Sequence, residues 1–142
     1  KALDTYDSVK FLIFDTHGKP GKLTFADGSE FDGMDFMVYA NPSFLSTNAR
    51  VLFLGCNVGE GADGDTFMKD VGMYLLKGKG GTLGASTAIV MTLTLGPFTT
   101  HAYIQPFSFG RLKVKRYDIL GSEVGSRTVD RHGISRPFLG IP

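Results

Sequence analysis

Two short apolar runs, each followed by a glycine and a reactive side chain, most constrain the fold that this chain can adopt. Val9–Phe14 is followed closely by His17 and Gly18, and the run 51–54 is followed by Gly55 and Cys56. Apolar runs of this length, bounded by glycine, predict strands buried on both faces of a sheet. In open α/β sheets, reactive groups gather at the carboxyl ends of the strands. We therefore expect two neighbouring parallel strands to bring His17 and Cys56 to one edge.

Length and composition limit the class of protein. The chain has 142 residues, 42% of them hydrophobic, and twelve are Phe, which is enough for one core and one domain, 1–142. Its net charge of +1 provides no electrostatic basis for binding nucleic acid or an anionic membrane. No stretch approaches the apolar length of a membrane span. A single cysteine excludes an internal disulfide framework but leaves the compartment open.

The elements around the two runs follow from turn and helix signals. The pair Asp27-Gly28 predicts a small hairpin, made of 22–25 and 30–31, beside His17. Pro42 is expected to start a short helix that reaches Leu45. The clearest helix has Asp63 as its N-cap and Gly78 as its stop. Its apolar face comprises Phe67, Val71, Tyr74 and Leu75.

The second half of the chain is expected to be rich in strands. Small residues at 81–87 predict a strand, which completes a strand, helix, strand unit. Segments 99–109 and 110–120 predict two further β segments. Within the second, Leu112 and Val114 alternate with lysines, so one face of that strand is expected to be solvated. The glycine-rich tail from Gly121 predicts an extended coil.

Cys56 requires a base or a cation if it is to act as a nucleophile, and an imidazole is the usual supplier. His17 has the best context, because it follows a buried strand and precedes Gly18. The amides of Gly18 and Cys56 could together form an oxyanion hole. Asp15 and Glu60 are near in sequence and could orient His17 or face a substrate. By residue type alone, such a cysteine is more often a small buried thiol, a His-Gly pair is more often a turn, and loop carboxylates are more often solvated.

His101 offers a competing, papain-like order, in which Cys56 comes first and the base follows in a β segment. Papain-type nucleophiles begin a helix, however, whereas three glycines separate Cys56 from the predicted helix here: Gly59, Gly61 and Gly64. His132 is the third histidine. No histidine lies at ligand spacing from another or from Cys56, so we expect neither a metal site nor a cofactor.

The order of these motifs resembles that of the caspase-type (clan CD) cysteine peptidases, in which a His-Gly pair ends one strand and the nucleophilic cysteine ends the next. Here the motifs are Thr16-His17-Gly18 and Gly55-Cys56. The stretch from Leu54 to Gly61, with Gly64, Phe67 and the Gly-Ala-Ser-Thr sequence at 84–87, is similar to caspase-like domains of large bacterial surface and toxin proteins. The match covers roughly residues 9–90.

The resemblance implies a three-layer α/β/α caspase-like fold with a mainly parallel central sheet and a β-rich C-terminal part. It implies a cysteine endopeptidase acting on a peptide or protein substrate, in a secreted or cell-surface protein. His17 would be the general base or acid, Cys56 the nucleophile, and the Gly18 and Cys56 amides the oxyanion donors. The Gln-Ala-Cys signature of the caspases proper is absent, so no preference for aspartate is implied. The alternative is a catalytically inactive binding module on the same fold.

The front of the domain departs from the resemblance. Caspase-type sheets begin with a strand and a helix before the histidine strand, yet only eight residues precede Val9. An apolar edge strand is seldom left open. We therefore expect a separate segment, an N-terminal fragment of the same precursor, to pair with Val9–Phe14. Self-processing of the peptidase would produce such a fragment, and trimming by another protease would explain the start at Lys1 equally well.

Overall fold

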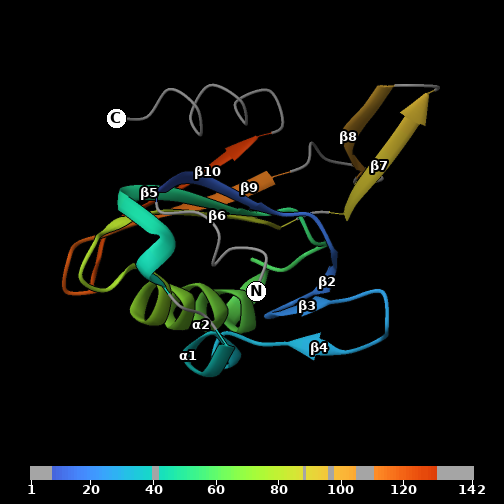
Figure 1. The fold of residues 1–142 in the computed structure, drawn as a ribbon. Coiled ribbons are helices and arrows are strands. Elements are labelled where there is room, and N and C mark those ends of the chain that lie inside the picture. Colours follow the sequence, from blue (N-terminus) through green and yellow to red (C-terminus); the bar gives the residue numbers. More distant parts are fainter. Residues whose placement is uncertain (1–7, 40–41, 88, 96–97, 105–110, 131–142) are drawn as a thin grey trace.

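The computed structural model of the chain describes residues 8–39, 42–87, 89–95, 98–104 and 111–130 (Figure 1). Its main sheet has five strands, in the order β1 (Val9–Phe14), β5 (Leu45–Phe53), β6 (Gly81–Ser86), β9 (Arg111–Tyr117) and β10 (Glu123–Asp130). β1, β5 and β6 run parallel, whereas β9 and β10 are antiparallel to their neighbours. The expected parallel pairing of the first two apolar runs is confirmed, within a sheet of mixed direction.

The remaining strands form two small sheets. One contains β2 (His17–Lys19), β3 (Lys22–Thr24) and β4 (Glu30–Phe31), and the other pairs β7 (Ile89–Leu95) with β8 (Phe98–Ile104). The hairpin expected around Asp27-Gly28 is confirmed as β3 and β4. It lies beside His17, which is opposite Thr24 in the β2–β3 pair. The expected segment 99–109 is a strand as far as Ile104, and residues 105–110 lie outside the described part.

The helices lie on one face of the main sheet (Figure 1). They are α1 (Asp35–Tyr39) and α2 (Gly61–Val71), which a π-helical turn, Gly72–Leu76, continues. Among the described residues no helix covers the opposite face. The protein is therefore mixed α/β and strand-rich, with two layers in the described part where we expected three.

The core between the sheet and α2 follows the predicted apolar pattern. Phe67, Val71 and Leu75 are buried, as the helical periodicity indicated. The Phe53 ring of β5 meets the Phe67 ring edge to face, with centroids 5.1 Å apart. Full burial of each such side chain contributes about 1.5–3 kcal/mol. This packing holds α2 against the face of the sheet.

The ends of α2 show where local signals succeed and fail. Gly78 has a φ of 86° and stops the helix, as predicted. The N-cap is Glu60 rather than Asp63, because the Gly64 amide already donates to the Glu60 carbonyl, 2.9 Å away. The prediction of Asp63 was therefore wrong by almost one helical turn.

The helix α1 was not predicted, although its sequence carries a capping box. Asp32 Oδ1 accepts hydrogen bonds from the amides of Met34 and Asp35, at 2.9 Å and 3.1 Å. In return, Asp35 Oδ2 accepts one from the Asp32 amide at 2.8 Å. The short helix expected from Pro42 to Leu45 is a 3₁₀ turn over Pro42–Phe44.

Two expectations for the C-terminal part were wrong. The tail from Gly121 is no coil over its first residues, because β10 pairs antiparallel with β9. Nor is the lysine face of β9 solvated, since Lys115 is buried between α2 and β10. Alternation of apolar and charged residues cannot show that a charged side chain has a partner. The tail beyond residue 130 and residues 1–7 lie outside the described part.

Candidate active site

His17 follows β1 after a two-residue link and begins β2. The Thr16 hydroxyl donates to the His17 carbonyl at 2.8 Å, which fixes the backbone at this point. The His17 side chain is exposed. Its position beyond the carboxyl end of β1 is the one that the sequence predicted.

Cys56 lies just beyond the end of β5. The Leu54 amide donates to the Phe14 carbonyl at 2.9 Å, so the parallel pairing continues to the last residue before Gly55. Asn57 then adopts a φ of 57°, and the Glu60 amide donates to the Asn57 carbonyl at 2.9 Å. This tight turn leaves Cys56 half-buried at the sheet edge.

Gly18 and Gly55 bring the two strand-end loops into backbone contact. A Cβ added at Gly18 would lie 3.0 Å from the Gly55 Cα and 3.1 Å from the Cys56 carbonyl oxygen. A Cβ added at Gly55 would lie 3.1 Å from the His17 carbonyl oxygen. Neither position has room for a methyl group, so both must be glycine. The structure thus brings together the backbones of the two residues that the sequence singled out.

Val58 fills the space below this contact. Its side chain is fully buried, and a Cβ at either glycine would lie within 2.6 Å of its Cγ2. Its carbonyl accepts a hydrogen bond from the Gly21 amide at 3.0 Å, which ties the Cys56 loop to the β2–β3 hairpin. Val58 was not singled out from the sequence, since a lone valine in a glycine-rich loop carries no periodic signal.

The third parallel strand also reaches this edge. The Gly59 amide donates to the carbonyl of Ser86, the last residue of β6, at 2.8 Å. Ser86 is completely buried, and we did not predict it as a site residue. The carboxyl ends of β1, β5 and β6 therefore meet around the Cys56 loop.

The carboxylates of Asp15 and Glu60 are both exposed on this edge. Glu60 caps α2 through its backbone and makes no side-chain cap bond. His101 lies on β8, opposite Thr92, in the separate two-stranded sheet. His132 lies outside the described residues. The described part contains no group of His, Cys, Asp or Glu that could hold a metal ion.

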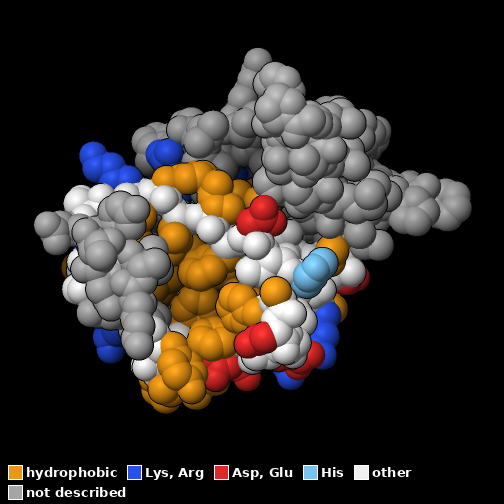
Figure 2. Space-filling model, turned by 45° about the vertical axis from the view of Figure 1, so that its right-hand side comes forward, with side chains coloured by type: hydrophobic (Ala, Val, Ile, Leu, Met, Phe, Trp, Pro, Cys, Tyr) orange, Lys and Arg blue, Asp and Glu red, His pale blue; other side chains and the backbone are white. Residues whose placement is uncertain are grey.

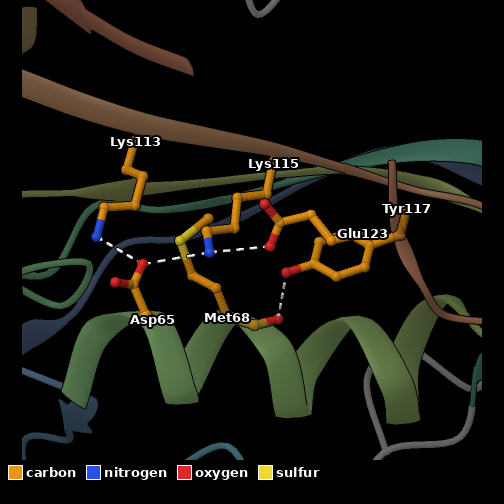
Figure 3. A network of polar contacts seen from close by, with 6 residues as sticks. All are labelled: Asp65, Met68, Lys113, Lys115, Tyr117 and Glu123. Atoms are coloured by element: carbon orange, nitrogen blue, oxygen red, sulfur yellow. Dashed lines mark hydrogen bonds and ion pairs between the residues drawn. The ribbon is translucent and has the colours of Figure 1, made fainter. Parts of the chain in front are cut away.

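A polar network fixes α2, and with it the loop that leads from Cys56 into the helix (Figure 3). Asp65 binds Lys113 at 2.8 Å and Lys115 at 3.2 Å. Lys115 also binds Glu123 of β10 at 3.0 Å. The Tyr117 hydroxyl donates to the Met68 carbonyl at 2.9 Å. These contacts lie on the side of α2 that faces β9 and β10.

The network shifts the acidity of its members. Hydrogen bonds from Lys113 and then Lys115 hold the pKa of Asp65 below its ordinary value. Burial lowers the pKa of Lys115, but its bonds to Glu123 and Asp65 outweigh burial, so the net shift is upward. Burial raises the pKa of Tyr117, which keeps its hydroxyl protonated as a donor. Each group therefore stays in the protonation state that its contacts require.

Comparison of the chain with protein-family models, curated proteins and solved structures finds no match. No helix in the described part is long and apolar enough to cross a membrane. A functional assignment must therefore rest on the geometry of this chain.

Proposed function

We propose that this protein is a cysteine endopeptidase in which Cys56 is the nucleophile and His17 is the general base and acid. The observation that carries the proposal is the contact between Gly18 and Gly55 at the ends of two adjacent parallel strands. Catalysis by two side chains requires that their backbones be held close together. We extend the proposal to a caspase-like α/β/α architecture for the whole protein.

In the proposed mechanism, the Cys56 thiolate attacks the carbonyl carbon of a peptide bond. The amides of Gly18 and Cys56 donate hydrogen bonds to the oxyanion that forms. The His17 imidazolium gives its proton to the leaving amine as the C–N bond breaks. Water, deprotonated by His17, then hydrolyses the thioester, which releases the acid product and restores the thiol.

Asp15 and Glu60 are proposed to contact the substrate, because both carboxylates are exposed at this edge. Substitution by Asn and Gln, respectively, should raise KM and leave kcat unchanged. A loss of kcat instead would assign Asp15 a role in positioning His17.

Two measurements test the dyad. Hydrolysis of a peptide library by the wild type should disappear in Cys56→Ala, a change that removes one sulfur atom and creates little cavity. Alkylation by iodoacetamide should proceed well below pH 8 in the wild type, and only at higher pH in His17→Ala. If the thiol reacts only at high pH and no peptide is cleaved, the chain is the inactive binding module.

The competing role of His101 has a separate test. His17→Ala should lower the rate of hydrolysis by several orders of magnitude, whereas His101→Ala should have little effect. The reverse pattern would support the papain-like order.

We also propose that an N-terminal fragment of the same precursor, released by self-processing, pairs with β1. Among the described strands, β1 is at one end of the sheet order. The Phe14 carbonyl accepts from the amide of Leu54, the residue after β5, so the backbone of Ile13 faces the other way, and the Ile13 side chain is 46% exposed. Added fragment should slow hydrogen exchange in β1; unchanged exchange would remove this part of the proposal.

A further inference from the structure

Helix α1 presents an apolar surface to solvent. Met37, Val38 and Tyr39 are 55%, 66% and 71% exposed, and the preceding Met34 is 46% exposed. We call these four residues the α1 surface. Figure 2 shows one face of the molecule, on which hydrophobic side chains gather over a broad area with acidic side chains along part of its border. Contiguous apolar surface of this kind marks interaction sites in soluble proteins, and flexible Met side chains adapt to a partner.

A hollow of about 310 Å³ adjoins the α1 surface at Met34. It lies between α2, the β2–β3 hairpin and the loop before α1. Two glycine contacts define its ends: a Cβ at Gly21 would lie 3.0 Å from Asp63 Cβ, and a Cβ at Gly33 would lie 2.7 Å from Asp70 Cβ. Phe67 of α2 also lines it. We call this space the acidic hollow.

Two carboxylates of the acidic hollow have no cation bound to them within the described part of the chain. Asp63 and Asp70 have no ion-pair or side-chain hydrogen-bond partner there, and Asp70 is half-buried. Lys22, the cation of the lining, is already bound to Glu30 at 3.1 Å. Asp63 and Asp70 are two turns apart on one face of α2, so they are separated by about 10 Å along the helix axis.

We propose that the α1 surface and the acidic hollow together form a docking surface for a basic, apolar segment of a partner protein. Apolar side chains of the segment would cover Met37, Val38 and Tyr39, and a neighbouring Lys or Arg would enter the hollow between the two aspartates. The apolar contact contributes binding energy, and the complementary charge selects the partner and orients it. The proposal does not depend on peptidase activity, because none of these residues belongs to the proposed dyad or oxyanion hole.

A random peptide library displayed on phage and selected on the purified chain tests the chemistry of the partner. The expected result is enrichment of peptides that combine Lys or Arg with apolar residues. Failure to enrich any peptide, or enrichment of peptides without basic residues, would overturn the proposal.

The affinity of one enriched, dye-labelled peptide then locates the site. We expect the paired change Asp63→Asn with Asp70→Asn to weaken binding by about tenfold or more. The pair Met37→Ser with Val38→Ser should do the same. Two matched controls, Asp27→Asn in the β3–β4 turn and Leu120→Ser in the β9–β10 turn, should leave affinity unchanged. Circular dichroism verifies that each variant is folded; folded site variants with wild-type affinity would refute the proposal.

Discussion

The two sides of helix α2 differ in whether their carboxylates are bound to cations, and we call them the paired side and the unpaired side. On the paired side, toward β9 and β10, Asp65 is bound to two lysines, and the Tyr117 hydroxyl donates a hydrogen bond to the Met68 carbonyl. Toward α1 and the β2–β3 hairpin, Asp63 and Asp70 have no such partners in the described part. One side therefore stabilises the fold, whereas the other leaves its charges available for a ligand. Carboxylates on one short helix can thus have different roles, which their partners determine.

The largest effect should come from filling a close contact on the side of the helix that faces β9 and β10. A Cβ at Gly72 would lie 2.4 Å from Tyr117 Cε1, and the hydroxyl bond to Met68 keeps that ring in place. Gly72→Ala should lower the free energy of unfolding by about 3 kcal/mol, measured by urea denaturation. Gly125→Ala is the control, because the nearest atom to its added Cβ is 4.0 Å away. Similar losses in both variants would mean that the ring moves freely.

A smaller but clear effect is expected at Lys115, whose side chain is 10% exposed. Lys115→Ala leaves the carboxylates of Asp65 and Glu123 without this cation, and it should cost about 2 kcal/mol of unfolding free energy. Lys22→Ala removes an exposed ion pair with Glu30 and should cost much less. Equal costs would remove the distinction between a buried network and a surface pair.

The contribution of Asp65 to the decrease of stability in acid should be modest. Because the pKa of Asp65 is lowered in the folded state, its stabilisation is fully present above its ordinary value of 3.8 and is lost as pH falls through the lowered value. Since Asp65 is half exposed, the effect should be well below about 1 kcal/mol. Asp65→Asn should flatten the dependence of stability on pH below about pH 4. If the stability of Asp65→Asn decreases with falling pH as steeply as that of the wild type, this linkage is contradicted.

The smallest change in the free energy of unfolding is expected on the unpaired side, toward α1 and the β2–β3 hairpin. Asp63→Asn and Asp70→Asn should each change the free energy of unfolding by less than about 0.5 kcal/mol, because no internal contact of the carboxylate is lost. A loss comparable to that of Lys115→Ala would show that these aspartates support the fold, and the comparison of the two sides would fail.

Local patterns in the sequence were enough to predict the elements around the candidate site. The apolar run of β1, the hairpin turn at Asp27-Gly28 and the helix stop at Gly78 were all predicted correctly. The helix α1 was missed, because its five residues are too few for a periodic signal and only its capping box marks it. β10 was missed because its pairing partner, β9, and not its own composition, makes it a strand.

The sequence by itself determined that His17 and Cys56 follow two apolar runs, because strand length, glycine and order are local properties of the chain. Only the tertiary structure decided that Gly18 and Gly55 lie in contact, that Val58 packs beneath them and that Lys115 is buried. Each of these depends on which backbone or side chain approaches from a distant part of the chain. They follow from the pairing of β1 with β5 and of β9 with β10, which joins residues far apart in the sequence.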